Sequence, residues 1–357
     1  MTLTQPTLDT RRHIRTMEDY QALYHYSLTD SLDYWKAQSR ELHWFYEPHG
    51  VFEEHGPGEF VWFGGGRLNA AVNCVDRHVA RNPEKTAIIF VADEPGEYQH
   101  ISFAELKTQV GRVANTLRSL GVRKGDRVCI YLPMIPELAY TMLACARIGA
   151  VHSIVFGGFS ADALRDRIID AEAKVVVTAN EGLRGGKRIP LKRITDDAVE
   201  GLGVVEKVLV VQRTDAETSM EQGRDLWFHE AAAEQRITCP SEWMAAEDPL
   251  FILYTSGSTG KPKGLVHTTG GYLTYAASSF KYVFDINEDD IHFCAADIGW
   301  ITGHSYIIYG PLANGVTTVM FESVPTYPDA SRYWNVVDDI GATTLYTSPT
   351  ALRAPMR

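Results

Sequence analysis

The sequence has few cysteines, and no two of them are spaced as a metal-binding or redox pair. The cysteines lie at positions 74, 129, 145, 239 and 294. An odd number without a CxxC motif argues against both a disulfide framework and a zinc knuckle. We therefore expect reduced thiols, as in a cytoplasmic protein.

The sequence also lacks an excess of basic residues. It has 34 Lys and Arg against 45 Asp and Glu, which gives a net charge of −11. This balance argues against nucleic acid or an anionic membrane as the main partner. It still allows a local basic pocket for a phosphorylated small molecule.

Long uninterrupted apolar runs are missing too. Residues 1–15 contain no apolar core of a signal peptide. The most apolar window, 138–159, is interrupted by Arg147 and His152, with Gly149 between them. A buried helix, a turn and a buried strand are expected here rather than a membrane span.

What the sequence does contain is enough apolar material for a large core. Apolar residues make up 45% of the 357 positions and aromatic residues 11%, a composition typical of a globular protein. The length predicts two or three folding units. Residues 1–80 are rich in aromatics without regular alternation, which predicts an extended lead-in, and residues 81–357 form the second domain.

From residue 86 onward, short apolar strands alternate with amphipathic helices. Ser102 and Glu105 form a capping-box pattern, and apolar residues follow at helical spacing. Ser160 begins a further helix. Strands are predicted at 87–91, 127–132, 151–155, 174–178 and 207–211. This order predicts an α/β fold with layered parallel sheets and flanking helices.

The segment FILYTSGSTGKPKG at 251–264 has the composition of a phosphate-binding loop. A buried-looking strand runs into glycines, hydroxyl side chains and lysines, which together supply amide donors, hydroxyl donors and positive charge. It is not a Walker loop, because only two residues separate Gly257 from Gly260 and Pro262 follows Lys261. A solvated surface turn is the alternative interpretation.

This segment resembles the signature of the acyl-adenylate-forming enzymes, and further stretches narrow the resemblance to the acetyl-CoA synthetase family. Those stretches lie at 60–78, 155–168, 181–192 and 297–318. The resemblance implies the N-terminal, AMP-binding part of an enzyme that converts acetate, ATP and coenzyme A to acetyl-CoA through acetyl-AMP. It also implies Mg²⁺ bound to the nucleotide phosphates.

The resemblance further implies roles for individual residues. Bulk in the acyl pocket would exclude longer acids. His267 and His304 are expected to be structural, and no catalytic residue or metal ligand is assigned. The residues expected to bind ATP phosphates are Thr255, Ser256, Gly257, Ser258, Thr259, Gly260, Lys261 and Lys263. Those expected to bind coenzyme A are Arg184, Gly185, Gly186, Lys187 and Thr302, and those lining the acyl pocket are Trp300, Ile301 and Thr302.

Members of this family continue beyond the segment that Ser348 and Pro349 begin, with an adenine-binding region, an acidic metal ligand and a lid that carries a catalytic lysine. We therefore expect an incomplete portion of such a ligase, without synthetase activity on its own. A non-catalytic nucleotide- or coenzyme A-binding fragment and a propionyl-CoA synthetase are the alternatives. The expected partners are small molecules, and the oligomeric state cannot be inferred from the sequence.

Overall fold

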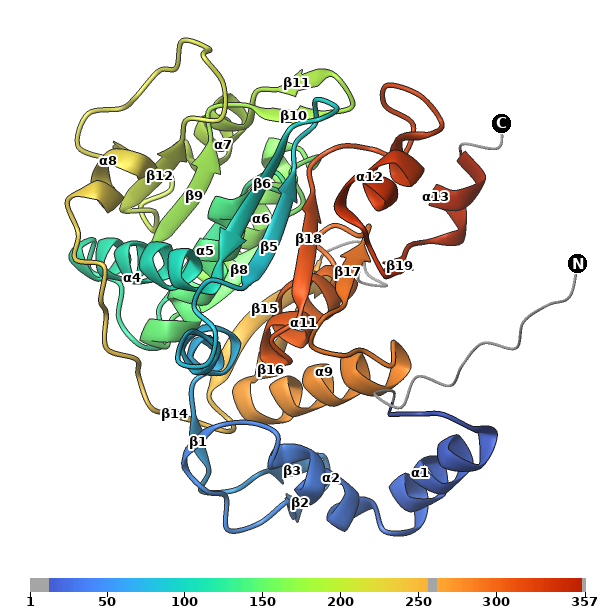
Figure 1. The fold of residues 1–357 in the computed structure, drawn as a ribbon. Coiled ribbons are helices and arrows are strands. Elements are labelled where there is room, and N and C mark those ends of the chain that lie inside the picture. Colours follow the sequence, from blue (N-terminus) through green and yellow to red (C-terminus); the bar gives the residue numbers. More distant parts are fainter. Residues whose placement is uncertain (1–12, 256–261, 355–357) are drawn as a thin grey trace, which may run out of the picture.

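The computed structural model describes residues 13–255 and 262–354. Two mainly parallel β-sheets lie side by side, with helices between and around them (Figure 1). This arrangement confirms the predicted layered α/β fold. One detail differs, because each sheet has an antiparallel strand at one edge.

The first sheet has seven strands, of which six are parallel. The last strand, β16, runs antiparallel to β15 and forms a hairpin with it. Most of the predicted apolar strands belong to this sheet. In spatial order the strands are β13 (Asp225–Trp227), β12 (Lys207–Val211), β9 (Val175–Ala179), β7 (Arg127–Tyr131), β8 (Val151–Ile154), β15 (Pro249–Thr255) and β16 (Lys263–Thr268).

The second sheet has five strands, with β6 antiparallel to β5 at its edge. Its order is β19 (Thr344–Tyr346), β17 (Ile291–Cys294), β18 (Thr317–Phe321), β5 (Thr86–Val91) and β6 (Tyr98–Ser102). A separate two-stranded hairpin is formed by β10 (Gly182–Arg184) and β11 (Lys187–Ile189).

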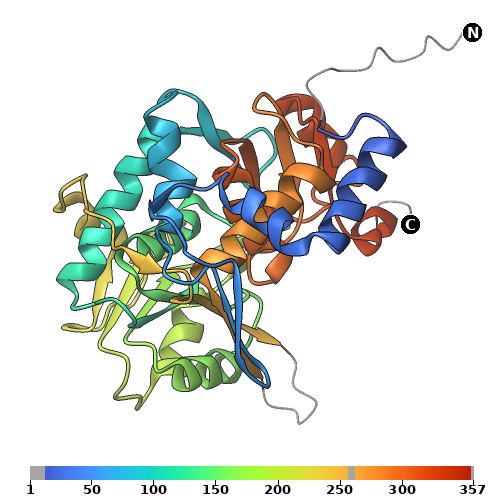
Figure 2. The ribbon, with the colours of Figure 1, turned by 90° about the horizontal axis from the view of Figure 1, so that it is seen from below.

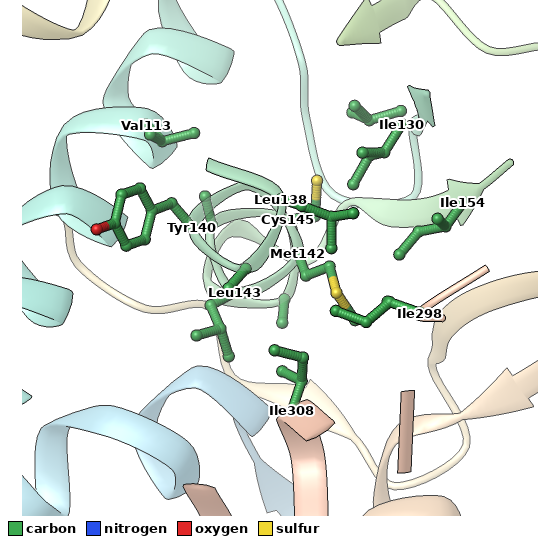
Figure 3. Packing of buried hydrophobic residues seen from close by; sticks show 14 of the residues in the cluster. Val113, Ile130, Leu138, Tyr140, Met142, Leu143, Cys145, Ile154, Ile298 and Ile308 are labelled. Carbon is green, nitrogen blue, oxygen red and sulfur yellow. The ribbon is translucent and has the colours of Figure 1, made fainter. Parts of the chain in front are cut away.

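Helix α5 (Pro136–Ile148) lies in the middle of the main hydrophobic core. It is apolar on nearly all sides, and such a helix is stable only when buried on all sides. Figure 3 shows its Leu138 and Met142 on the side of Ile130 and Ile154 of the first sheet, and its Leu143 near Ile308 of the segment His304–Tyr309. The chain then turns at Gly149, whose φ is 73°, into β8. The predicted helix, turn and strand at 138–159 are confirmed.

The remaining helices are α3 (Arg77–Val79), α4 (Phe103–Ser119), α6 (Ala161–Ala171), α7 (Leu191–Val199), α8 (Phe228–Ala233), α9 (Thr269–Val283), α10 (Ile301–Gly303), α11 (Gly310–Ala313), α12 (Arg332–Ile340) and α13 (Pro349–Arg353), with π-helical segments at Val72–Asp76 and His304–Tyr309. Two of these helices, α4 and α6, begin at the serines that the sequence marks. The Ser102 hydroxyl accepts a hydrogen bond from the Glu105 backbone N–H at 3.1 Å, and Ser160 caps α6 in the same way.

The lead-in differs from the extended segment that the sequence predicts. It contains two helices, α1 (Met17–Thr29) and α2 (Ser31–Ser39), of which α1 begins with a capping box formed by Thr16 and Asp19. The helices were missed because α1 buries no side chain and so shows little apolar periodicity. The short strands are β1 (Trp44–Tyr46), β2 (Phe52–Gly56), β3 (Glu59–Trp62) and β4 (Arg67–Leu68), and β14 (Met244–Ala245) pairs with β4.

Aromatic side chains fasten the lead-in to itself and to the larger domain, as expected. The rings of Trp35 and Trp62 are 6.4 Å apart, and those of Phe45 and Trp243 stack at 5.0 Å. The helices of the lead-in lie along α9 (Figure 2), where the Ser278 hydroxyl donates a hydrogen bond to Gln38. Within the described ranges, no helix is both long enough and apolar enough to cross a bilayer.

Candidate functional site

The predicted phosphate loop connects β15 to β16. In the register of this hairpin, Thr255 pairs with Lys263, and both residues are exposed. Residues Ser256, Gly257, Ser258, Thr259, Gly260 and Lys261 lie outside the described part of the chain. Phosphate binding by this loop therefore stays a prediction, with its two ends positioned at the edge of the first sheet.

The strand that leads into this loop is anchored to α6. The Tyr254 hydroxyl donates a hydrogen bond to Asp170 at 2.7 Å. The guanidinium of Arg167 lies 4.8 Å from the ring centroid of Phe159 and 5.5 Å from that of Tyr254. Burial, with Asp170 adding to it, raises the pKa of Tyr254, so its hydroxyl stays protonated and keeps donating. These contacts fix the direction in which the chain leaves β15.

The predicted coenzyme A segment is the hairpin of β10 and β11. Arg184 pairs with Lys187, and Gly185 and Gly186 form the two-residue turn with φ values of 62° and 73°. Two positive φ values define the tight turn that matches the twist of a hairpin, and glycine adopts them at little cost. Side chains directly opposite each other lie on the same face, so the two cations lie together beside the turn.

Arg184 is oriented by two neighbours. Its guanidinium lies 5.2 Å from the ring centroid of Phe156, and its Nη1 lies 3.6 Å from Oδ2 of Asp297. The side chain keeps 38% of its surface exposed. A cation held on an aromatic face and still reachable from solvent is available to a phosphate ligand.

Asp297 joins this hairpin to the turn that carries the predicted acyl-pocket residues. Its Oδ1 accepts a hydrogen bond from the Gly299 N–H at 2.8 Å. Burial raises the pKa of Asp297, while the Gly299 N–H and Arg184 oppose that shift. The carboxyl group thus links Arg184 to the chain that continues into Trp300. The coenzyme A and acyl predictions, made on stretches more than 100 residues apart, meet here.

Trp300 and Ile301 line two different cavities. Trp300 borders a cavity of about 510 Å³ together with Phe156 and Tyr254. Ile301 borders another of about 480 Å³, whose walls include Trp62 and Tyr272. Thr302 follows within α10 and is partly buried. Of the three predicted acyl-pocket residues, Trp300 is therefore the one on the side of the predicted phosphate loop and of the β10–β11 hairpin.

The two histidines considered at this site are packed among aromatic rings. Nδ1 of His304 lies 3.1 Å from the Trp300 carbonyl oxygen, and burial lowers the pKa of His304 to about 4. The ring of His267 stacks on Phe251 at 4.5 Å, and burial lowers its pKa as well. Both rings are therefore neutral at pH 7. This agrees with the structural role expected for them from the sequence.

Several residues of this region were not indicated by patterns in the sequence. Asp297 stands two positions before a glycine, a pattern typical of a side chain that caps its own turn, and this signal could have identified it. Phe156 and the buried acidic residues Asp93 and Glu322 act through partners far away in sequence, so no local pattern identifies them.

No metal centre stands out among the described residues, since no three His, Cys, Asp or Glu side chains in 13–255 and 262–354 gather as potential ligands. The described part of the site presents the cations Arg184 and Lys187 and the aromatic face of Phe156. Such groups suit anionic ligands of low molecular weight.

Comparisons with known families and with curated proteins match the chain to the same group of enzymes. The family described as AMP-binding enzyme matches residues 75–357, and the one described as acetyl-coenzyme A synthetase N-terminus matches residues 20–74. Among curated proteins, acetyl-coenzyme A synthetase 2 of Pseudomonas aeruginosa is 57% identical over 344 residues, which cover 95% of this chain and 53% of that protein.

Two other relatives give nearly the same values. The acetyl-coenzyme A synthetase of Halorhodospira halophila is 56% identical, over 95% of this chain and 53% of its own length. That of Rubrobacter xylanophilus is 55% identical, over 94% of this chain and 52% of its own length. The chain thus spans about half the length of the curated relatives that it matches.

Proposed function

The chain belongs to the family of AMP-binding enzymes, and we propose that it supplies phosphate, coenzyme A and acyl subsites of an AMP-forming acetate–CoA ligase. Its substrates would be acetate, ATP and coenzyme A. Arg184, Lys187 and Thr302 would contact coenzyme A, the two cations through its phosphates. The loop from Thr255 to Lys263 would bind phosphates of ATP.

Such a ligase solves a chemical problem that acetate poses. A carboxylate repels nucleophiles and has no good leaving group. In the first step a carboxylate oxygen attacks the α-phosphorus of ATP, a P–O bond forms, and pyrophosphate leaves. In the second step the sulfur of coenzyme A attacks the acyl carbon of acetyl-AMP, the thiol proton is lost, and AMP leaves.

The residues of this chain would contribute mainly by binding charge. Negative charge grows on the leaving pyrophosphate, and the hydroxyls, amides and lysines of 255–263 would stabilise it. The loss of one such donor typically costs about 3 kcal/mol of transition-state stabilisation. An ionised carboxylate needs no general base for the first step, which is consistent with the neutral, buried state of His304.

The observation that carries this proposal is the contact between the coenzyme A hairpin and the acyl turn. Arg184 lies 3.6 Å from Asp297, and Asp297 accepts the Gly299 N–H immediately before Trp300. The second step requires the coenzyme and the acyl group to meet. A cation for the coenzyme beside the turn for the acyl group supports that requirement.

The proposal also includes Mg²⁺ and a preference for acetate. Mg²⁺ would enter as the counter-ion of ATP, but the described residues offer no carboxylate cluster for it, so no step above depends on it. A preference for acetate over propionate would follow from bulk at Trp300 and Ile301. One methylene changes binding by only about 1 to 3 kcal/mol, so propionate would be a weaker substrate.

We further propose a cytoplasmic location, because all five cysteines are buried free thiols. Buried thiols without disulfides suit a reducing compartment. The acidic net charge of −11 favours small-molecule partners over nucleic acid.

Calorimetric titration tests the binding part of this proposal. The chain should bind both ATP and coenzyme A, and the double variant Arg184→Ala/Lys187→Ala should lose coenzyme A affinity by at least about tenfold per charge-assisted contact. ATP affinity should stay unchanged. The control Arg81→Ala removes one exposed charge before β5 and should change neither affinity. Equal coenzyme A affinity in the double variant and the parent would contradict the proposal.

A further inference from the structure

We propose that Asp93 is a positioning residue for coenzyme A, which holds the Gly185–Gly186 turn so that Arg184 and Lys187 face the ligand. The inference rests on the proposed function, because it takes those two cations as the coenzyme A contacts. Asp93 lies just after β5 of the second sheet and is 3% exposed. The hairpin follows β9 of the first sheet, so the hydrogen bonds between Asp93 and the turn link a segment of the second sheet to one of the first. In Figure 1, β10 and β11 lie beside the end of β5 and β6.

Both oxygens of the Asp93 carboxylate bind the turn. Oδ1 accepts a hydrogen bond from the Gly185 N–H at 2.6 Å, and Oδ2 accepts one from the Gly186 N–H at 2.8 Å. Successive backbone N–H groups of a turn can point to the same side and form an anion-binding concavity. Here the protein's own carboxylate fills that concavity.

This contact changes the expected role of the two glycines. The family resemblance implies that Gly185 and Gly186 are among the residues that bind coenzyme A. Their amides already donate to Asp93, so they are not available to a phosphate. The glycines would act through the shape of the turn, and direct binding would fall to Arg184 and Lys187.

Asp93 is itself held in place by a buried ion pair. Its backbone N–H donates a hydrogen bond to Oε2 of Glu322 at 3.0 Å. The Glu322 carboxylate also accepts two hydrogen bonds from Arg213, from Nε at 2.8 Å and from Nη2 at 2.7 Å. Arg213 follows β12 of the first sheet, and the Glu322 side chain is fully buried. A two-pronged pair of this kind restricts both partners. The Glu322 charge is thereby balanced, and the Asp93 carboxylate is left to the turn.

The turn also lies close to the segment that follows β18. A Cβ added at Gly185 would lie 2.8 Å from Val324, and one at Gly186 would lie 2.7 Å from the ring of Tyr327. Packing against this segment therefore adds to the hydrogen bonds from Asp93 in fixing the position of the turn.

The hairpin needs this support. Among the described strands, β10 and β11 pair only with each other and join neither large sheet. An isolated two-stranded hairpin is marginal in water. Without the carboxylate, the turn would keep its packing contacts but lose both charge-assisted hydrogen bonds. The side chains of Arg184 and Lys187, which flank the turn, would then occupy a wider range of orientations.

Replacement of Asp93 by a neutral residue distinguishes an effect of turn geometry on coenzyme A binding from an effect of charge alone. Asp93→Asn keeps one acceptor but presents an amide NH₂ to a backbone N–H. Removal of a negative charge beside the hairpin would strengthen binding of the anionic coenzyme if charge alone mattered. If Asp93 positions the turn, the same substitution weakens coenzyme A binding. Asp338→Asn, at an exposed position of α12, is the matched control for the same change of charge.

The experiment compares the parent chain with both variants by hydrogen–deuterium exchange and by calorimetry with coenzyme A and with ATP. In Asp93→Asn, amides of peptides spanning 182–189 should exchange about tenfold to hundredfold faster, as expected for a lost charge-assisted hydrogen bond. Coenzyme A affinity should fall by about tenfold, ATP affinity should be retained, and Asp338→Asn should match the parent throughout. A general folding defect would lower both affinities.

Unchanged exchange at 182–189 would overturn the inference, and so would faster exchange with coenzyme A affinity equal to or above that of the parent. Equal loss of ATP and coenzyme A binding would also overturn it, since that pattern marks damage to the whole fold. If the parent chain fails to bind coenzyme A, the proposed function fails together with the inference. That result is distinguishable, because it is seen before any variant is compared.

Discussion

Substitution of Gly186 by alanine tests whether the shape of the hairpin turn matters for coenzyme A. Gly186 has a φ of 73°, and a Cβ at this position would lie 2.7 Å from the ring of Tyr327. The change adds one methyl group and alters no charge. Any effect on coenzyme A binding must therefore come from geometry.

Two costs add at this position. A left-handed conformation costs a non-glycine residue about 1 to 2 kcal/mol. The ring of Tyr327, the outer end of its side chain, must also shift to make room for the methyl group. The backbone cost alone is comparable with one of the charge-assisted hydrogen bonds to Asp93, which contribute about 1.5 to 3 kcal/mol each. The turn should therefore rearrange rather than accept the strain, and the chain should remain folded because the hairpin can open locally.

Gly121 provides the control, because its φ is 89° and a Cβ added there would have no atom within 4 Å. Gly121→Ala should lower the free energy of unfolding by about 1 to 2 kcal/mol and leave coenzyme A affinity unchanged. Gly186→Ala should raise the Kd for coenzyme A by about tenfold in calorimetry. If it binds coenzyme A as tightly as Gly121→Ala does, the argument that the turn orients the cations is refuted.

Two further predictions concern stability. A Cβ at Gly111 would lie 1.9 Å from the carbonyl oxygen of Ile237, so Gly111→Ala should lower the free energy of unfolding in urea by about 3 kcal/mol or more; parental stability would contradict this packing. Burial lowers the pKa of His78, His292 and His304 from 6.5 to about 4. Between these values the unfolded chain binds protons that the folded chain does not, so stability should fall as the pH falls, by about 2 kcal/mol per histidine between pH 7 and pH 5. Urea titrations at the two pH values measure this loss, and equal stability at both would argue against neutral, buried rings.

Much of the fold follows from local patterns in the sequence. The Ser102 cap, the apolar helix before Gly149 and the strand at 207–211 all depend on neighbours within a few residues, and all are confirmed. The sequence does not indicate the lead-in helices because the apolar residues of α1 are not gathered on one face and none of them is buried, so that only its Thr16–Asp19 capping box marks it. The antiparallel edges depend on which strands meet in space, and local patterns do not determine this.

The candidate site was only partly predictable for a related reason. The segments that carry Arg184 and Trp300 have recognisable compositions. What joins them is Asp297, and what holds the hairpin is Asp93, whose bonds to the turn span more than 90 residues. Such contacts have no signature in a single sequence. The sequence therefore indicates candidate ligand-binding residues, and the fold was needed to identify the residues that hold them.

A crystal structure of the chain with bound coenzyme A would show whether the β10–β11 hairpin beside Asp297 is the coenzyme A site. We predict phosphate oxygens within hydrogen-bond distance of the Arg184 guanidinium and the Lys187 ammonium, with the amides of Gly185 and Gly186 still donating to Asp93. Coenzyme A bound elsewhere, with both cations free of phosphate, would contradict the claim.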